Sequence, residues 1–205
     1  MNTISSGFYN FSLWISRLAY VNLLWIVFSL LGLGVLGLMP ATAGMFAVIR
    51  KWVLGRDDIP IFSTFWGTFK KEFLKINLIG YILILIGYVL YMEVRILWVQ
   101  ESAVYILAGF GVLALIFIYS IVLLYIFPIF AHFKLNTFQY IKWPAIIGIV
   151  HPILTIVLGG GLLFLHYLTY VTIPALLFFF GGSVTAYVLT WGISKTFNKY
   201  EQTAS

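Results

Sequence analysis

The segment "AYVNLLWIVFSLLGLGVLGL", residues 19–38, decides the fold class because it contains no charged side chain. An α-helix rises about 1.5 Å per residue, so roughly 20 apolar residues cross the hydrocarbon core of a bilayer. Four later segments have a similar length and character, at about residues 76–98, 104–130, 144–165 and 173–191. The sequence therefore predicts an all-α integral membrane protein, a five-helix transmembrane bundle that forms a single membrane domain over residues 1–205.

The composition of the whole chain agrees with a membrane protein. Of the 205 residues, 62% are hydrophobic and 9% are charged, and the mean hydropathy is +1.05. There is no cysteine, which excludes disulfides, thiolate catalysis and cysteine-ligated metals. The formal net charge of +6 is expected to orient the loops rather than to bind nucleic acid, because no soluble basic domain with interleaved aromatic residues is present.

The positions of the lysine and arginine residues predict how the chain is oriented. Ten of the twelve fall in connections that lie on one side of the five predicted spans: Arg50, Lys51, Arg56, Lys70, Lys71, Lys75, Lys134, Lys142, Lys195 and Lys199. The positive-inside rule makes this side cytoplasmic, with the N-terminus outside and the C-terminus inside. A cleavable signal ending at "ATA", residues 41–43, is disfavoured because the preceding apolar run is long and cleavage would put the most basic loop outside.

The connection at residues 41–75 holds the charged stretch "GRDDIPIFSTFWGTFKKEF", residues 55–73. Its aromatic residues recur at helical spacing and define one apolar face: Phe62, Phe65, Trp66, Phe69 and Phe73. A shorter helix is expected at about residues 41–54, with Gly55 at its end and two aspartates before the next helix. The pattern predicts two amphipathic helices lying on the cytoplasmic face of the membrane.

Two interpretations of this charged loop are compatible with each other. In the first, the loop is a membrane anchor whose rings lie at the level of the lipid headgroups: Phe62, Phe65, Trp66 and Phe69. In the second, its charged residues form a docking surface for a cytoplasmic protein: Arg50, Lys51, Asp57, Asp58, Lys70 and Lys71. The anchor interpretation is favoured because basic amphipathic helices commonly lie on membranes.

No catalytic, cofactor-binding or metal-binding residues are predicted, and we expect the protein not to be an enzyme. The motifs GxxxxGK[ST] and HExxH are absent, and no two of the three histidines, His132, His151 and His166, stand three or four residues apart. His151 precedes a proline within the fourth predicted span. It is either a functional histidine or, the favoured alternative, a packed polar residue that bonds a neighbouring helix.

Several short motifs carry a resemblance to a known family. They are "PATA" at residues 40–43, "RKW" at 50–52, "DIP" at 58–60, "FW" at 65–66, "FKKEF" at 69–73 and "HFKLNTFQYIKWPAIIGIVHPI" at 132–153. In these motifs the chain resembles the YesL family of bacterial multi-spanning membrane proteins, whose biochemical function is unassigned. The resemblance implies the bacterial cytoplasmic membrane. It also implies an association with carbohydrate-uptake ABC transporters, beside whose genes members of the family tend to be encoded.

The expected function is therefore that of a non-enzymatic accessory or scaffold membrane subunit in carbohydrate uptake of the ABC type. Its expected partners are membrane lipid and the permease subunits of the transporter. The alternative is a small solute carrier or channel, acting alone or as an oligomer, with a water-lined path to His151 or Asn22. The sequence does not predict the oligomeric state.

Overall fold

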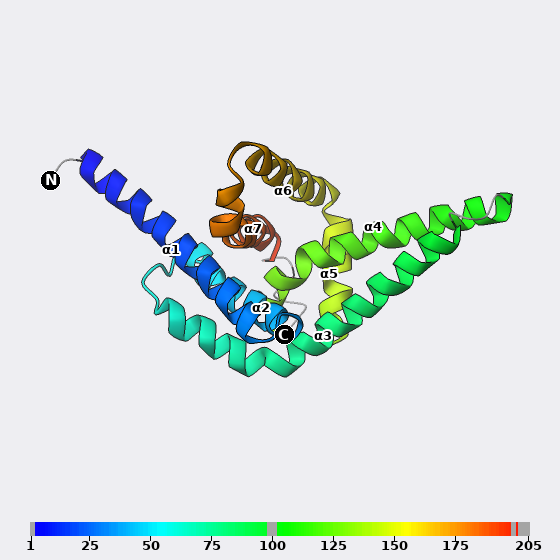
Figure 1. The fold of residues 1–205 in the computed structure, drawn as a ribbon, viewed down its shortest axis with the longest axis horizontal. Coiled ribbons are helices and arrows are strands. Elements are labelled where there is room, and N and C mark those ends of the chain that lie inside the picture. Colours follow the sequence, from blue (N-terminus) through cyan, green and yellow to red (C-terminus); the bar gives the residue numbers. More distant parts are fainter. Residues whose placement is uncertain (1–2, 98–101, 198–199, 201–205) are drawn as a thin grey trace.

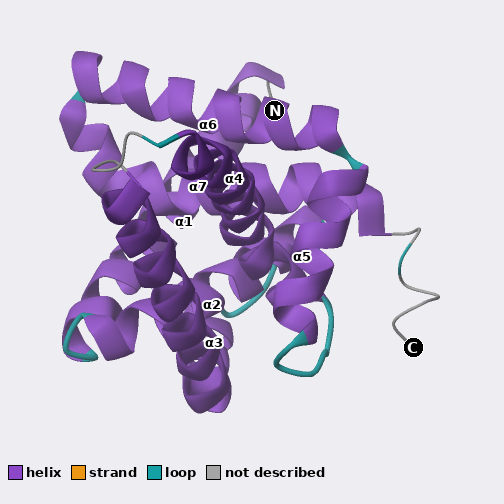
Figure 2. Cartoon of the chain, turned by 90° about the vertical axis from the view of Figure 1, so that its right-hand side faces the viewer, coloured by secondary structure: helices purple, strands orange, loops and turns teal. Residues whose placement is uncertain are grey.

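The computed structural model describes residues 3–97, 102–197 and 200, and this part of the chain consists of helices joined by turns and loops, without strands (Figure 1). Its helices are α1 Thr3–Leu31, α2 Val35–Val53, α3 Ile61–Leu97, α4 Ala103–His132, α5 Gln139–Val150, α6 Pro152–Thr172 and α7 Pro174–Phe197. Figure 2 shows how short the loops between most of these helices are. The all-α prediction is confirmed.

Five of the helices are long and apolar enough to cross a membrane. They are residues Phe11–Leu31 of α1, and α3, α4, α6 and α7 over their full lengths. This agrees with a membrane bundle with five candidate spans. The limits of three predicted spans change, however, and each change has a local physical cause.

The first predicted span, residues 19–38, is wrong at its C-terminal limit because the chain turns at residues 32–34. Leu33 and Gly34 have φ angles of 58° and 72°, in the left-handed region that glycine adopts most readily. A Cβ atom on Gly37 would lie 2.6 Å from the backbone oxygen of Phe28, so only glycine fits where α2 leaves the turn. The run of glycines that looked like part of a span is instead a tight helical hairpin.

Helix α2 runs antiparallel to α1 and forms the centre of the protein. The indole nitrogen of Trp25 donates to Thr42 Oγ1 at 2.9 Å, and farther from the turn the rings of Trp14 and Trp52 lie 5.7 Å apart. Helix α2 also contacts α3, α4 and α7, and most of its residues from Pro40 to Ile49 are buried. The prediction of a surface helix at residues 41–54 is therefore wrong, because small side chains there let neighbouring helices approach closely.

Helix α3 joins two elements that were predicted to be separate. The amphipathic segment and the second span, residues 76–98, form one helix of 37 residues. No glycine or proline lies between Thr68 and Ile79, so nothing interrupts the helix there. Asn77 Nδ2 donates to the carbonyl of Leu36 at 3.0 Å and fixes the middle of α3 to the start of α2. The region 41–75 is therefore part of the folded core rather than a separate loop.

The fourth predicted span, residues 144–165, is interrupted at His151, so the candidate span is α6. Pro152 has no backbone N–H and cannot continue α5 without clashing with the preceding turn. The hydroxyl of Thr155 lies 2.8 Å from the carbonyl oxygen of Gly148 and 3.1 Å from that of His151. It also lies 2.8 Å from the hydroxyl of Tyr125 on α4. Thr155 thus provides polar partners where the helix breaks.

A buried asparagine fastens the first helix to the last. Asn22 is 1% exposed; its amide nitrogen donates to the carbonyl of Phe178 at 2.8 Å, and its amide oxygen accepts from the backbone N–H of Ser183 at 3.0 Å. Polar side chains commonly join helices in this way inside membranes. Both ends of the Asn22 amide are therefore used to hold α1 against α7.

Candidate functional site

A large hollow with many polar side chains lies between α2, the first half of α3 and the C-terminal end of α4. Its volume is about 740 Å³. The polar and ionisable residues that line it come from these three helices, the segment after α4 and the start of α5: Arg50, Lys51, Ser63, Thr64, Thr68, Lys71, Glu72, Lys75, His132, Lys134 and Tyr140. We call this hollow the basic hollow, because five of these side chains are lysine or arginine and one is a carboxylate.

Hydrogen bonds to neighbouring elements hold three of the basic side chains in place. Arg50 Nε donates to His132 Nδ1 at 3.1 Å, which joins α2 to the end of α4. Lys51 Nζ donates to Thr64 Oγ1 at 3.1 Å, which joins α2 to α3. Lys75 Nζ donates to the carbonyl of Leu135 at 2.7 Å. These contacts fix the walls of the basic hollow relative to one another.

Tyr140 organises the segment that follows α4. Its hydroxyl donates to the carbonyl of Phe133 at 2.8 Å and accepts from the backbone N–H of Leu135 at 3.0 Å. The ammonium group of Lys75 lies 4.7 Å from the centre of its ring. Burial, above all, raises the pKa of Tyr140, and the nearby carboxylate of Glu72 acts in the same direction. The phenol therefore stays neutral at physiological pH and keeps its donor hydrogen.

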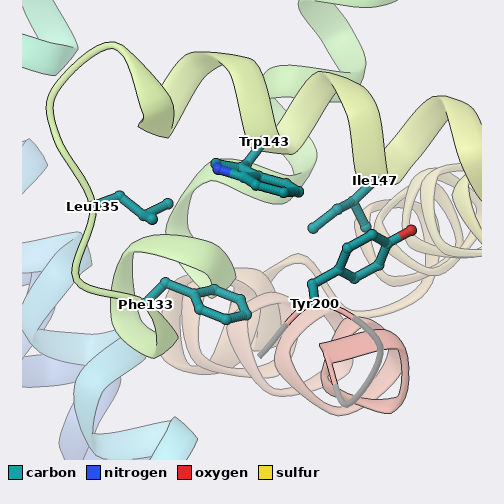
Figure 3. Close-up of a pocket in the computed structure, with 5 residues that line it drawn as sticks. All are labelled: Phe133, Leu135, Trp143, Ile147 and Tyr200. Atoms are coloured by element: carbon teal, nitrogen blue, oxygen red, sulfur yellow. The ribbon is translucent and has the colours of Figure 1, made fainter. Parts of the chain in front are cut away.

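A second, much smaller hollow lies beside the segment that follows α4. Figure 3 shows its lining residues, Phe133, Leu135, Trp143, Ile147 and Tyr200, and its volume is about 10 Å³. A space of this size holds about one water molecule. It is therefore a packing gap between aromatic and aliphatic side chains, and the basic hollow is the better candidate for a ligand.

The structure brings together only half of the predicted docking residues. Arg50, Lys51 and Lys71 line the basic hollow. Asp57 and Asp58 are exposed on the turn between α2 and α3, and Lys70 is exposed with its ammonium group 5.0 Å from the centre of the Trp66 ring. The six residues are therefore divided between the basic hollow and the surface beside it.

The predicted membrane-anchor residues pack mainly against the protein itself. The rings of Phe62, Phe65, Trp66 and Phe69 all lie within 6.2 Å of the ring of Phe28 on α1, measured between centroids. Phe65 is 0% exposed and Phe69 is also buried, so neither can face lipid in this structure. The apolar face of the helix was recognised correctly, but its partner is α1. Phe62 is 48% exposed, so anchoring of this ring in the membrane stays a prediction.

Several residues of the basic hollow were not predicted as site residues, namely Glu72, Lys75, His132 and Lys134. The spacing of Lys71 and Lys75 was a usable signal, since residues four apart share a helix face. No local pattern could have joined His132 and Lys134 to them, because this contact depends on how α4 packs against α2.

The three histidines have separate surroundings. His132 accepts from Arg50, as described above, and its ring lies 4.4 Å from that of Phe197. His151 lies between α5 and α6, and its Nδ1 is 3.1 Å from the carbonyl oxygen of Ile147 in the preceding helix, α5. His166 Nε2 lies 3.2 Å from Thr185 Oγ1, which joins α6 to α7. Within the described residues, no group of three or more His, Cys, Asp or Glu is placed to hold a metal ion.

Comparison with known proteins shows the family. The family "Protein of unknown function, DUF624" matches residues 18–94. Among curated proteins, YesL of Bacillus subtilis (strain 168) is 37% identical over 202 residues, which cover 98% of this chain and 95% of YesL. The chain belongs to the YesL (DUF624) family. YteU and YesV of the same bacterium are 37% and 38% identical over 85% and 90% of the chain, covering 78% and 88% of those proteins.

All three relatives are described as uncharacterized proteins. No solved structure matches this YesL-family chain. The sequence resemblance to the family is thus confirmed. The DUF624 match covers about half of α1, all of α2 and most of α3, and α2 and α3 form two walls of the basic hollow.

Proposed function

We propose that the protein is a non-enzymatic accessory or scaffold subunit that docks a protein partner at the cytoplasmic face of the bacterial membrane. The observation that carries the proposal is the exposed, mixed-charge surface formed by Asp57, Asp58, Lys70 and Lys71 beside the basic hollow. In the described part of the chain none of these four residues forms an ion pair. Their charges are therefore available to a partner of complementary charge, which favours specificity and fast association.

The turn that carries the aspartates has a defined backbone. At the end of α2, the N–H of Gly55 donates to the carbonyl of Trp52 and the N–H of Arg56 donates to that of Lys51, both at 2.9 Å. Gly55 has a φ angle of 76°. This is the Schellman arrangement, in which a left-handed glycine closes a helix. It holds Arg56, Asp57 and Asp58 at a fixed place beside α3, and a preorganised surface loses less entropy on binding.

The candidate partner and the orientation are parts of the same proposal. The family resemblance suggests the permease subunits of a carbohydrate-uptake ABC transporter as the first partner to look for. The concentration of lysine and arginine around the basic hollow supports a cytoplasmic location for this end of the molecule under the positive-inside rule. In this proposal the C-terminus lies in the cytoplasm. Trp14, near the start of the candidate span in α1, packs against Trp52 beside Arg50 and Lys51, so we propose that the N-terminal end of this span lies at the same end of the molecule as the basic hollow.

The test is affinity purification in mild detergent from the native bacterium grown on a complex polysaccharide, with mass spectrometry of the co-purified proteins. The Asp57→Lys/Asp58→Lys variant should lose the permease subunits while remaining in the membrane. Arg95→Glu is the control because Arg95 is exposed near the far end of α3 and its reversal also changes surface charge. This control should retain the partner.

Two results would contradict the proposal. Equal recovery of permease subunits with Asp57→Lys/Asp58→Lys and with the unmodified protein would show that the turn is not the docking surface. Recovery of the unmodified protein alone, in near-pure form, would contradict the proposal that it is an accessory subunit. Transport measurements in liposomes would then test the alternative of a small carrier or channel.

A further inference from the structure

We infer that the basic hollow is a binding site for a phosphate group carried by a small molecule or by a lipid. The chemistry of its walls leads to this conclusion. Five basic side chains, Arg50, Lys51, Lys71, Lys75 and Lys134, converge there from different elements with one carboxylate, Glu72. This inference goes beyond the proposed function, and Lys71 is the residue that the hollow shares with the docking surface.

The concentration of positive charge is unfavourable unless an anion compensates for it. Lys71 and Lys75 are four residues apart on α3, so their like charges share a helix face and repel each other. Lys134 adds positive charge from the segment after α4. Membrane proteins do use basic pockets of this kind to hold anionic groups such as phospholipid headgroups. The arrangement favours an acceptor-rich anion in the hollow.

The donors in the hollow fit phosphate better than they fit a carboxylate. Beside the five cations, the walls carry the hydroxyl groups of Ser63 and Thr64 on α3, while that of Thr68 donates to the carbonyl of Thr64. A phosphate monoester has three strong acceptor oxygens and a charge of about −1.5 to −2 at neutral pH, so it can engage donors from several walls at once. Arginine and lysine are the side chains that proteins most often use for this group.

The size of the hollow indicates that the phosphate carries an organic group. Ligand pockets for small molecules have volumes of about 300–1,000 Å³, and the basic hollow, at about 740 Å³, falls in this range. Its wall also contains the apolar side chains of Ala43, Ala47 and Phe130. These can contact either the carbon skeleton of a soluble phosphomonoester or the glycerol and first carbons of a phospholipid.

The residues have two different roles in this site. Arg50, Lys51 and Lys75 are held by His132, Thr64 and Leu135, so they shape the walls. Lys71 and Lys134 are exposed and belong to different walls, α3 and the segment after α4. Their removal should weaken anion binding without breaking any of the hydrogen bonds that join the helices.

The test compares two double variants with the same change in net charge. The first is Lys71→Gln/Lys134→Gln. The matched control is Lys70→Gln/Lys142→Gln, because Lys70 and Lys142 are exposed on α3 and α5 but do not line the hollow. Thermal unfolding without added ligand should give the same midpoint for both variants, which shows that both are folded.

Binding is measured in two arms that distinguish the source of the phosphate. In the first arm, inorganic phosphate and pyrophosphate are titrated into the full-length protein in neutral detergent, and the dissociation constant is determined by calorimetry. In the second arm, the protein in nanodiscs of phosphatidylcholine is compared with the protein in nanodiscs that also contain phosphatidic acid. Retained phosphatidic acid is then counted by native mass spectrometry.

The unmodified protein should bind in at least one arm, and Lys71→Gln/Lys134→Gln should weaken that binding at least about tenfold, since charge-assisted hydrogen bonds contribute strongly. The control variant should change it less than about twofold, because rim charges outside a site act only through screened long-range attraction. Absence of binding in both arms would overturn the inference. Equal weakening by the two double variants would also overturn it, because it would show attraction to net charge rather than a site.

Discussion

The charged end of the molecule and its apolar arm use the same kinds of aromatic and aliphatic residue in opposite ways. We define the apolar arm as residues 84–97 of α3 and 103–118 of α4, which project together from the rest of the protein at the right of Figure 1. In the arm, large apolar side chains such as Leu85, Leu107 and Phe110 are exposed. Around the basic hollow, Phe65 and Ile76 are buried against other helices, and the exposed residues include lysines and aspartates.

This contrast indicates which surroundings, lipid or water, each region is suited to. A continuous apolar surface of this extent is not stable in water but is natural in lipid, where helices satisfy their own backbone hydrogen bonds. At the charged end, the protein supplies its own apolar environment and leaves charged groups outside. The difference teaches that exposure alone does not identify a binding surface in this molecule, because the most exposed apolar side chains lie where lipid would cover them.

The largest effect is expected from removing a ring at the charged end. Phe65→Ala should lower the free energy of unfolding by about 3–5 kcal/mol, because the ring is 0% exposed and its removal leaves a cavity beside Phe28. Phe62→Ala is the control on the same helix face, and it should cost clearly less because Phe62 is 48% exposed. Reversible unfolding in detergent measures both values.

Equal losses for Phe65→Ala and Phe62→Ala would contradict the packing of α3 against α1. They would favour the sequence-based interpretation, in which both rings rest on lipid at the surface of the membrane.

A charge placed in the arm should have the next largest effect. Leu85→Lys should oppose membrane insertion by about 2.5–3.5 kcal/mol, the cost of a lysine near the centre of a transmembrane helix. Leu74→Lys is the matched control, because Leu74 is 82% exposed and Leu85 is 62% exposed, both on α3. Leu74→Lys should change insertion by less than about 0.5 kcal/mol, as surface substitutions usually do.

The two lysine variants are compared by the amount of full-length protein recovered in washed membranes relative to the unmodified chain. If Leu74→Lys reduced recovery as much as Leu85→Lys does, the boundary between the arm and the charged end would not be where the structure places it.

Adding one methyl group should lower the stability of the protein in the hairpin turn but not in the arm. Gly37→Ala should destabilise the protein by about 1–3 kcal/mol, because the new Cβ would lie 2.6 Å from the backbone oxygens of Phe28 and Ser29, which cannot move aside cheaply. Gly109→Ala in the arm has nothing within 4 Å of its new Cβ. It should be neutral or slightly stabilising, since alanine favours helix more than glycine does.

Both alanine variants are compared by their thermal midpoints in the same detergent. A neutral Gly37→Ala would show that α1 and α2 are farther apart at the turn than the structure indicates, as they would be in a straight helix over residues 19–38.

The sequence predicted the parts of the fold that depend on composition and period. Apolar run length was enough for the all-α class and for five candidate spans, and Gly55 was correctly placed at the end of a helix because its position and chemistry are local. The prediction that the aromatic residues at 62–73 form one apolar helix face was also correct. Which surface it packs against was not predictable, because lipid and the apolar side of α1 are chemically alike.

The errors arise where tertiary structure decides between two local possibilities. Gly32, Gly34 and Gly37 are compatible with a close-packed span and with a tight hairpin, and periodicity alone does not distinguish them. Pro152 removes a backbone donor at the break after His151, and Thr155 and Tyr125 supply polar partners there. The basic hollow needs α4 to return to α2, a contact between residues 82 positions apart in the case of Arg50 and His132.

The most direct test of the account is the reactivity of single cysteines, which is clean because the chain has none of its own. Asp57→Cys and Leu113→Cys are made separately; Asp57 is exposed in the turn before α3 and Leu113 is 60% exposed in the arm. Membranes are opened by freezing and thawing, so that a charged maleimide reaches both faces, and the rate of labelling is measured.

The account predicts that the Asp57→Cys variant is labelled rapidly and that the Leu113→Cys variant is labelled only after the membrane is dissolved and the protein is denatured. Rapid labelling of both variants in intact bilayers would contradict it, because the apolar arm would then lie in water and the contrast between the two regions would lose its physical basis.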